Sequence, residues 1–394
     1  MSAPLEGVRV IDVSQFISGP LCATLLAEMG AEVIKVEPKI GDTLRVWTSL
    51  IHPELEALFC ALNKNKKSLT LNLRDKEGVE IFKRLASKSD ILVENLGPGT
   101  MNEFGLGYEK LRELNPRLIY VSISGFGRTG PYRERTAFDL IAQGAGGTAK
   151  LVERVGNKPK MFIGDIVSGV YAALGAMLAL YWREKTGMGQ LVDVSMQDVV
   201  FSINLAGIVE TALGEKAEKI GLSITKYPPG IKLPLYGIYP AQDGEVAICA
   251  LTDAQAKRLF RAMGMEELVS EGKFSTFISR FENDEELNKV VSSWTSKMKR
   301  DEIVRLLANA KVPCGPIYDV SELRNDEQLK ARGMLVEVEY KGMKFQIPGV
   351  CVKLSESPGS VKPAPELGKH NIEILSSLGY SEDEIRNFER KGVI

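Results

Sequence analysis

Residues 8–13, Val8-Arg9-Val10-Ile11-Asp12-Val13, decide the fold, because this short apolar run is followed by a helical pattern and then by a second apolar run. The helix is predicted over residues 20–29, with Pro20 in its first turn and Gly30 directly after its end. The second run covers residues 32–37. A strand, a helix and a strand within about thirty residues predict two parallel strands joined by a crossover helix.

The same alternation continues along the first half of the chain. Strands are predicted at 68–73, 90–94, 118–124 and 191–196, and helices at 76–87, 108–114 and 166–185. The strand cores are apolar runs, as expected when both faces of a sheet are covered. The pattern predicts an α/β fold, a doubly wound parallel sheet with helices on both faces.

The predicted helix at 166–185 has the strongest pattern in the chain. Large apolar side chains recur at helical spacing along one stripe, and alanines fill the rest. We therefore expect it to be buried nearly all round. Its uncharged run is shorter than the roughly 20 apolar residues of a membrane span, so no membrane segment is predicted.

A second domain is predicted after the Pro-rich residues 226–234. Its boundaries are 225–325, leaving residues 1–224 and a C-terminal segment, 326–394. Pro313-Cys314-Gly315-Pro316 is expected to end it in a tight turn, with Cys314 as a buried thiol. Strands at 237–239 and 246–250 and several helices predict a small α+β domain.

Composition excludes several classes of function. The 394 residues include 50 basic and 51 acidic ones, so no global field attracts nucleic acid or an anionic membrane. Five scattered cysteines without a CxxC pair argue against a disulfide framework or a zinc ribbon and fit a reducing cytosol. Two histidines cannot form a three-histidine metal site, and no metal is predicted. Residues 1–7 show no targeting pattern, so a cytoplasmic location is expected.

One motif resembles a fingerprint of dinucleotide binding. Gly125-Phe126-Gly127-Arg128-Thr129-Gly130 matches G-x-G-x-x-G after a predicted strand, but no helical pattern follows it. The fingerprint needs a helix whose N-terminus holds the pyrophosphate. A nicotinamide oxidoreductase is therefore the most distant alternative.

Two further features leave alternatives open. Lys64, Lys66, Lys67 and Arg74 form a basic cluster, which is favoured as solvated surface and could also bind a phosphate. Asp165 precedes the predicted helix at 166–185. It is either an N-cap, worth ~1 kcal/mol, or a carboxylate kept ionised for chemistry.

The chain also resembles a known family, the class III CoA-transferases, which include formyl-CoA and carnitine CoA-transferases and, as a relative, α-methylacyl-CoA racemase. The resemblance covers nearly the whole chain. It rests on Pro4-Leu5-Glu6-Gly7-Val8-Arg9-Val10-Ile11-Asp12, Ser18-Gly19-Pro20, Gly30-Ala31-Glu32-Val33-Ile34-Lys35-Val36-Glu37, Gly41-Asp42, Asn63-Lys64-Asn65-Lys66-Lys67-Ser68, Glu94-Asn95-Leu96-Gly97-Pro98-Gly99, Ser122-Ile123-Ser124-Gly125-Phe126-Gly127, Gly164-Asp165, Thr186-Gly187-Met188-Gly189-Gln190, Pro313-Cys314-Gly315-Pro316 and Pro365-Glu366-Leu367-Gly368-Lys369-His370.

The resemblance implies a large doubly wound domain built from both chain ends, with a smaller domain inserted between them. It also implies a homodimer of interlocked rings. The implied substrates are an acyl-CoA and a small carboxylic acid, with coenzyme A as a substrate and not a tightly bound cofactor.

By resemblance, Asp165 matches the family's catalytic aspartate, which attacks the thioester and then carries CoA as an aspartyl thioester. Family positions that contact CoA match Gln15, Ile17, Ser18, Leu71, Asn72, Leu73, Arg74, Asn95, Leu96 and Gly97, and Leu71 to Arg74 belong to the strand that holds the adenosine. Lys39 stands beside the position of a phosphate-binding arginine. Phe138, with Gln15 and Phe16, is implied at the acid-binding pocket.

Two departures from the family pattern bear on function. Glu103 stands where relatives carry an arginine, and an acid cannot bind phosphate there. Phe138 stands where the racemase branch has a histidine, and phenylalanine cannot exchange a proton. A CoA-transferase is therefore predicted, with a racemase and a non-catalytic subunit of a heteromeric transferase as alternatives.

Overall fold

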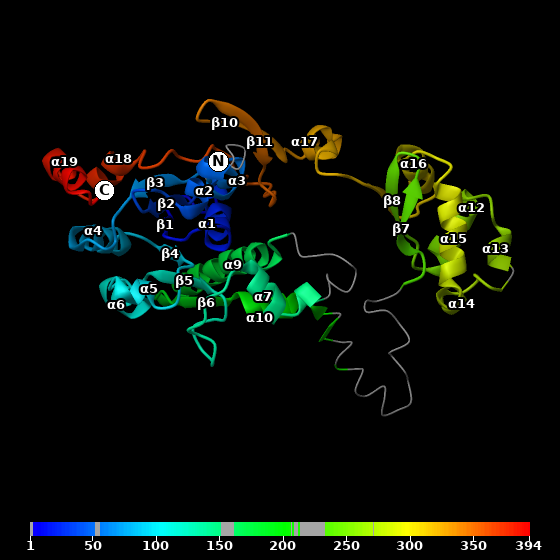
Figure 1. Ribbon diagram of the computed structural model, residues 1–394, viewed down its shortest axis with the longest axis horizontal. Helices are drawn as coiled ribbons and strands as arrows, with labels where there is room; N and C mark the ends of the chain where they lie inside the picture. Colours follow the sequence, from blue (N-terminus) through cyan, green and yellow to red (C-terminus); the bar gives the residue numbers. More distant parts are fainter. Residues whose placement is uncertain are drawn as a thin grey trace. The chain divides into compact units, whose positions relative to one another are not determined.

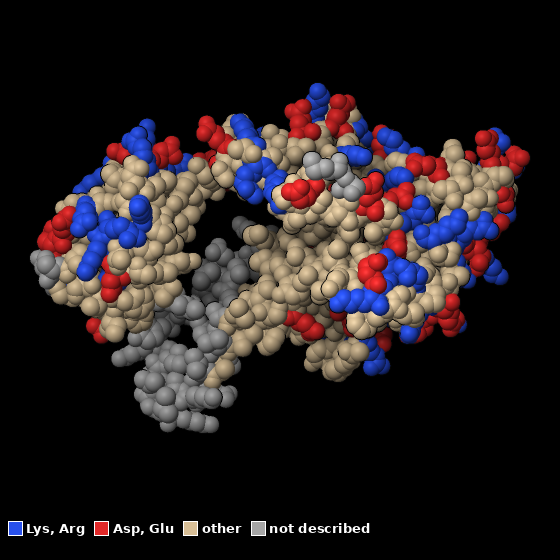
Figure 2. All heavy atoms as spheres, turned by 180° about the vertical axis from the view of Figure 1, so that it is seen from behind, with Lys and Arg blue, Asp and Glu red and all other residues tan. Residues whose placement is uncertain are grey.

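A computed structural model describes residues 3–51, 56–150, 161–205, 207–208, 212, 233–270 and 272–394. The chain divides into two compact units, Met1–Leu205 with Lys330–Ile394, and Ala206–Leu329. Both ends of the chain thus belong to unit 1, whose helices and sheet are labelled in Figure 1. Figure 2 shows charges of both signs interspersed over the visible face of each unit, as the net charge of −1 suggests.

Unit 1 is built on a six-stranded sheet in the order β3-β2-β1-β4-β5-β6, with every pair parallel. Its strands are β1 (Arg9–Asp12), β2 (Glu32–Glu37), β3 (Lys67–Thr70), β4 (Ile91–Glu94), β5 (Ile119–Ser124) and β6 (Leu191–Ser195). The predicted parallel α/β sheet is confirmed. Its strand order reverses between β1 and β4, and such a switch point opens a crevice at the carboxyl ends of the strands.

Helices cover both faces of this sheet. One core joins it to α1 (Ser18–Glu28), α9 (Ile163–Thr186) and α10 (Met196–Ile203). The other joins it to α4 (Lys76–Ser87), α6 (Tyr108–Leu114) and the C-terminal helices α18 (Asn371–Ser377) and α19 (Glu382–Lys391). The chain's last residue, Ile394, is itself buried in this second core.

Shorter elements complete unit 1. They are α2 (Thr43–Ile51), α3 (Glu56–Asn63), α5 (Thr100–Glu103), α7 (Asp139–Ala145) and the antiparallel hairpin β10 (Leu335–Tyr340) and β11 (Met343–Pro348). The sequence pattern at residues 336–340 and 344–347 also predicts two strands, and the hairpin confirms them. The four short helices were not expected.

Helix α9 is not buried all round, so that prediction is wrong. Its small side chains, such as Ala172 and Ala176, are buried, while Leu178 and Tyr181 are more than 60% exposed. The reason is close packing against α1: a Cβ on Gly169 would lie 2.6 Å from the carbonyl oxygen of Ser18. The small face therefore turns inward and the large apolar stripe outward.

By length and hydropathy, α9 is also long enough to cross a membrane, and 44% of its most apolar window is buried in the protein. A core helix passes the same test, so this single helix is weak evidence for a membrane span.

Unit 2 contains a three-stranded antiparallel sheet, β7 (Tyr236–Ala241), β8 (Gly244–Cys249) and β9 (Cys314–Ile317), in that order. Its helices are α12 (Asp253–Ala262), α13 (Glu267–Ser270), α14 (Phe277–Glu282), α15 (Asp284–Thr295), α16 (Arg300–Asn309), the 3₁₀ turn η3 (Glu322–Asn325) and, at the boundary, α17 (Glu327–Ala331). Most of the expected linker, residues 226–232, lies outside the described residues.

Cys314 does not lie in a tight turn as expected. It begins β9, where it pairs with Ile248 and is only partly buried. Pro313 precedes β9 and Pro316 lies within it, and an edge strand tolerates proline because one side of it needs no ladder hydrogen bonds.

Candidate active site

The turn between β1 and α1, residues 14–17, lies where the strand order reverses. Asn95, just after β4, holds this turn through three hydrogen bonds. Its Oδ1 accepts from the Gln15 N–H at 2.8 Å, and its Nδ2 donates to the Gln15 carbonyl at 2.8 Å and to Ser18 Oγ at 3.1 Å. Phe16 takes a left-handed backbone conformation, φ 62°, which strained turns at functional sites often contain.

A pocket of about 490 Å³ opens beside this turn. Asp165 lines it, from the first turn of α9. Gln15, Phe16, Ser18, Asn95, Leu96, Gly97, Phe138 and Arg135 are among the residues that surround it. Phe138 packs edge-on against Phe16, with ring centroids 5.5 Å apart, so this part of the wall is apolar.

Asp165 is not the N-cap of its helix, so the purely structural alternative is wrong. The N-cap is Phe162, and Asp165 is the third residue of α9. The backbone N–H of Asp165 donates to Asp139 Oδ1 at 3.2 Å. A carboxylate from α7 therefore accepts from one of the N–H groups that have no partner within the first turn of α9. The side chain of Asp165 is thereby left to the pocket.

The pocket raises the pKa of Asp165 to about 6. Burial contributes most, because it disfavours the charged form, and the nearby charge of Asp139 adds to it. The hydrogen bond with Ser18 opposes both. Asp165 is therefore a partly desolvated carboxylate that still ionises below neutral pH, which suits a nucleophile.

Asp139 and Gln143 form the support behind Asp165. Gln143, which is fully buried, donates to Asp139 Oδ2 at 2.6 Å and to the Met161 carbonyl at 2.8 Å. In the sequence, Asp139 stands out only as the neighbour of Phe138. No sequence signal brings residues 139 and 165 together, since the contact joins two helices.

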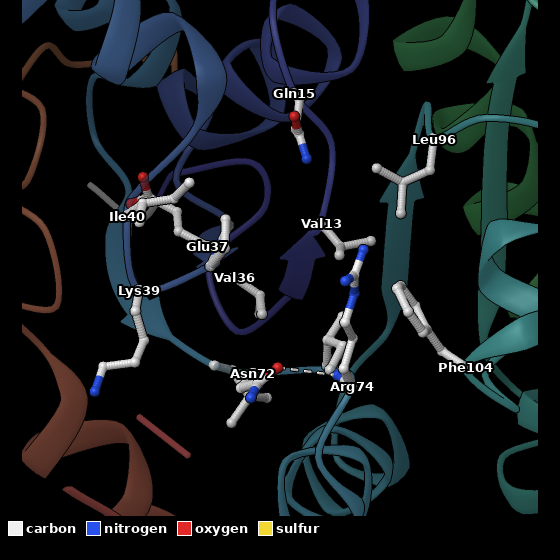
Figure 3. A pocket seen from close by; sticks show the side chains of 13 residues that line it. Val13, Gln15, Val36, Glu37, Lys39, Ile40, Asn72, Arg74, Leu96 and Phe104 are labelled. Carbon is white, nitrogen blue, oxygen red and sulfur yellow. Dashed lines mark hydrogen bonds between the residues drawn. The ribbon is translucent and has the colours of Figure 1, made fainter. Parts of the chain in front are cut away.

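A second pocket, of about 440 Å³, lies over β2 and the end of β3 (Figure 3). Its lining includes Val13, Gln15, Lys39, Leu71, Asn72, Leu73, Arg74 and Leu96. Lys39 and Arg74 lie on either side of Asn72 in Figure 3, and both are exposed. Since Gln15 and Leu96 also line the pocket of Asp165, the two pockets adjoin at these residues, and together they make up the cleft along the carboxyl edge of the sheet.

Residues 71–74 are not the end of a strand, as expected, but a turn between β3 and α4. Asn72 Oδ1 accepts from the Arg74 N–H at 3.1 Å, which bends the chain away from the sheet. The Asn72 N–H donates to the carbonyl of Val393 at 2.7 Å. The C-terminal segment thus helps to shape this pocket.

The cleft brings together Asp165 and all but one of the positions that the resemblance assigns to CoA or acid binding. Ile17 is the exception, because its side chain lies in a small core with Phe59 and Leu44 and lines neither pocket. Glu103 is exposed at the end of α5 and also lines neither pocket. Arg135 and Thr136, which line the pocket of Asp165, were missed.

Two lysines of the basic cluster are buried ion-pair partners, so the interpretation of that cluster as solvated surface is wrong. Lys66 contacts Asp12 at 2.7 Å and also donates to the carbonyl of Pro20 at 2.9 Å. Lys64 contacts Glu28 at 2.6 Å. Only Arg74 of the four is exposed and available to a phosphate.

The Lys66–Asp12 pair belongs to a network beneath the cleft. Asp12 also accepts from the Ser14 N–H at 3.0 Å, and Lys35 donates to the Ser14 carbonyl at 3.0 Å and contacts Asp42 at 2.8 Å. Burial raises the pKa of Asp12, but the two lysine charges outweigh it, and the net pKa is lowered. Burial lowers the pKa of Lys66 to about 8 although Asp12 opposes it. The network holds the turn that carries Gln15 and Phe16.

No group of three or more His, Cys, Asp or Glu side chains arranged to hold a metal ion occurs in the described part of the chain. The G-x-G-x-x-G match at residues 125–130 is followed by turns and not by a helix, so it lacks the geometry for a pyrophosphate.

A family model described as CoA-transferase family III matches residues 5–371. The chain is 37% identical over 400 residues to succinyl-CoA–D-citramalate CoA-transferase of Chloroflexus aurantiacus, covering 99% of this chain and 98% of the relative. It is 36% identical to the β subunit of succinyl-CoA–L-malate CoA-transferase from the same organism, covering 99% and 98%. It is 32% identical to formyl-CoA:oxalate CoA-transferase of Streptomyces avermitilis, over all of both chains.

Among solved structures, a CaiB/BaiF family protein from Brucella suis matches with a TM-score of 0.80 and 32% identity. The match covers 96% of this chain and all of the other.

Proposed function

The chain belongs to CoA-transferase family III and is a CoA-transferase, and from that premise we propose that Asp165 is the covalent carrier of the transfer. The observation that supports the proposal is the position of Asp165. It is a carboxylate with a raised pKa that does not cap its own helix, and it lines a pocket that adjoins a second pocket with two cations.

The steps follow from the carboxylate chemistry. An oxygen of Asp165 attacks the thioester carbonyl carbon, the C–S bond breaks, and a mixed anhydride and CoA thiolate form. The thiolate attacks the Asp165 carbonyl carbon, which releases the donor acid and leaves an aspartyl-CoA thioester. The acceptor carboxylate then repeats these two steps in reverse, so no proton is gained or lost. Covalent catalysis of this kind divides one difficult exchange into easier steps.

The second pocket is proposed to hold the nucleotide end of CoA. Leu71, Leu73 and Val13 supply apolar surface, and Lys39 and Arg74 supply positive charge for phosphate. The thioester end then reaches the turn at Gln15, which both pockets share.

The proposal is tested by mass spectrometry of the peptide that contains Asp165, after incubation with a panel of acyl-CoAs. We expect a CoA or acyl adduct on Asp165 that is absent from Asp165→Ala. Measurable CoA binding without any adduct from any donor contradicts the covalent mechanism.

Charge in the nucleotide pocket has a measurable consequence. We expect Arg74→Ala and Lys39→Ala each to raise the Kd of CoA about tenfold, because each removes one cation from a phosphate. Isothermal titration with CoA and with pantetheine, which carries no phosphate, measures this. If the variants lose as much affinity for pantetheine as for CoA, the two cations do not contact the phosphates and this prediction is contradicted. Lys76→Ala, an exposed cation at the start of α4, is the control.

The pKa of Asp165 sets a pH dependence. The carboxylate is charged above about 6, so the rate of adduct formation is expected to fall about tenfold for each pH unit below that value. In Asp139→Asn the like charge is gone while burial remains, so the acid limb moves to lower pH. The amide keeps the acceptor for the Asp165 N–H, and Gln143 has a free Oε1 that can turn to meet the new NH₂. Stopped-flow measurement of adduct formation at several pH values gives the acid limb of the wild type and that of Asp139→Asn. If the two limbs have the same midpoint, the role of Asp139 is contradicted.

A racemase is the less favoured alternative. It needs a second proton-exchanging group beside the α-carbon, and Phe138 occupies the expected place. His370 caps α18 instead, where its Nδ1 accepts from the Ser68 N–H at 3.1 Å, and His52 lies outside the described residues.

The assembly is proposed to be a homodimer of interlocked rings, located in the cytoplasm. The exposed apolar stripe of α9 is an argument for a second chain that packs on unit 1, since monomeric proteins rarely expose such a stripe. A relative at 36% identity is one subunit of a two-subunit enzyme, so a heteromer is the alternative. Sedimentation of the purified chain together with its transfer activity separates the two: an active species with the mass of two copies supports the homodimer.

A further inference from the structure

The pocket of Asp165 contains a cation that the transfer steps do not use. Arg135 lines this pocket, and it is the only lysine or arginine to do so among the residues that the structure describes. The two cations proposed for CoA, Lys39 and Arg74, line the other pocket.

Arg135 is held in place by aromatic stacking. Its guanidinium carbon lies 3.7 Å from the centre of the Tyr132 ring. The backbone N–H of Arg135 donates to the Tyr132 carbonyl at 2.8 Å, which closes the turn that brings the two residues together. Tyr132 in turn packs edge-on against Phe126, at 5.7 Å between ring centroids. A guanidinium stacked by its face keeps its N–H edge free, and that edge matches a carboxylate through two parallel hydrogen bonds.

Neighbouring arginines already have acidic partners. The guanidinium of Arg133 contacts Glu134 at 3.2 Å, and that of Arg128 lies 3.9 Å from Glu94. Within the described ranges no carboxylate is paired with Arg135. An anion that enters this pocket would therefore find one cation not already neutralised.

Arg135 and Asp165 line the same pocket from different segments, Asp165 from α9 and Arg135 from the stretch before α7. The pocket has a volume of about 490 Å³, which is enough for a short acyl chain. The wall there includes Phe16, Phe138 and Met196, which suit a short hydrocarbon chain.

We propose that Arg135 is a specificity-determining residue that binds the distal carboxylate of a dicarboxylic acyl group, while Asp165 reacts at the other end. This assignment rests on the proposed function and deepens it, because it names the substrate class of the same pocket. A salt bridge formed in a pocket that the ligand closes off is charge-assisted and bidentate, and it discriminates against the acid that lacks the second carboxylate.

The experiment compares succinyl-CoA with butyryl-CoA, which has a methyl group in place of the distal carboxylate. Both carry the same CoA, so the ratio of their rates of Asp165 adduct formation cancels every contribution of CoA binding. We expect the wild type to favour succinyl-CoA by roughly 10- to 100-fold, the range of a hydrogen-bonded charge pair. In Arg135→Ala the preference is lost, and Arg135→Lys restores part of it.

Arg133→Ala is the matched control, since Arg133 lies two residues away and is already paired with Glu134. It is expected to keep the wild-type preference. If Arg135→Ala slows both donors equally, Arg135 contacts CoA or the fold and the assignment is overturned. A wild type without preference overturns it as well.

Failure of the proposed function is distinguishable from failure of this assignment. If no donor leaves an adduct on Asp165, the covalent mechanism is wrong, and equilibrium dialysis of succinate and butyrate in the presence of CoA still tests Arg135. Succinate binding that depends on Arg135 supports the assignment, and equal binding to wild type and Arg135→Ala overturns it.

Discussion

Asp165→Asn is expected to lower the transfer rate by at least about 10³-fold and, at the same time, to stabilise the protein at pH 7. The amide cannot attack a thioester, so the activity is lost. The variant is more stable because the raised pKa of Asp165 means that the charged carboxylate is unfavourable in the folded protein, where it is buried beside Asp139. Removing that charge is worth on the order of 1–3 kcal/mol in the free energy of unfolding.

The pH dependence gives this prediction its sign. The pKa of Asp165 is higher in the folded state than in the unfolded one, so the carboxylate destabilises the fold fully above about 6. The advantage of the asparagine variant is therefore expected at pH 7 to 8 and to vanish near pH 4, where the wild-type group is neutral in the folded protein and half-neutral in the unfolded one. Urea unfolding at several pH values measures it.

Asp198→Asn is a matched control, because Asp198 is also the third residue of its helix, α10, but is exposed. There the carboxylate interacts favourably with the helix dipole, and its loss is expected to cost a few tenths of a kcal/mol and no activity. An Asp165→Asn variant that is destabilised like Asp198→Asn, or that still transfers CoA, would contradict the assignment of Asp165.

Lys66→Met is expected to destabilise the protein by about 3 kcal/mol, the low end of the usual cost of breaking a buried ion pair, because Lys35 stays 3.8 Å from Asp12. Lys66 contacts Asp12 at 2.7 Å, and neither side chain is exposed. Because Asp12 also binds the Ser14 N–H, its altered position should loosen the turn at Gln15 and raise the Kd of CoA in the variant that still folds. Chemical unfolding and CoA titration measure the two effects.

Lys67→Met provides the comparison, since Lys67 is the next residue and its pairs with Glu32 and Glu373 are partly solvated. It is expected to cost less than about 1 kcal/mol. The double variant Lys66→Met with Asp12→Asn also removes the buried carboxylate charge that has lost its nearer lysine, and it should recover part of the lost stability. Equal losses in Lys66→Met and Lys67→Met would contradict the role of the buried pair.

The sheet could be predicted because its signal is local. Strands such as β1 and β4 are mostly apolar runs, and the crossover helix α1 has boundary residues at both ends, Pro20 in its first turn and Gly30 just after it. The short helices α2, α3, α5, α7 and α10 carry weaker signals, because fewer than ten residues give little periodicity and their boundaries depend on tertiary contacts.

A sequence motif predicts a candidate site residue by its own position. It does not predict contacts with residues that are distant in the sequence. Asp165 and the CoA-binding stretches are implied by resemblance, and the cleft contains all of them except Ile17. The burial of Lys64 and Lys66 was not predictable, because their partners Glu28 and Asp12 lie 36 and 54 residues away. The orientation of α9 likewise depends on a contact of Gly169 with α1, which periodicity does not contain.

The two pockets share a wall, formed in part by Gln15 and Leu96, and this limits how the enzyme can diversify. If acyl-CoA binds as proposed, a substitution at either residue alters the environment of both ends of the ligand, so we expect it to impair CoA binding even where it suits a new acid. Phe16, Arg135 and Phe138 line only the pocket of Asp165. Lineages that exchange one acid for another are therefore expected to vary at these three positions while the shared wall stays constant.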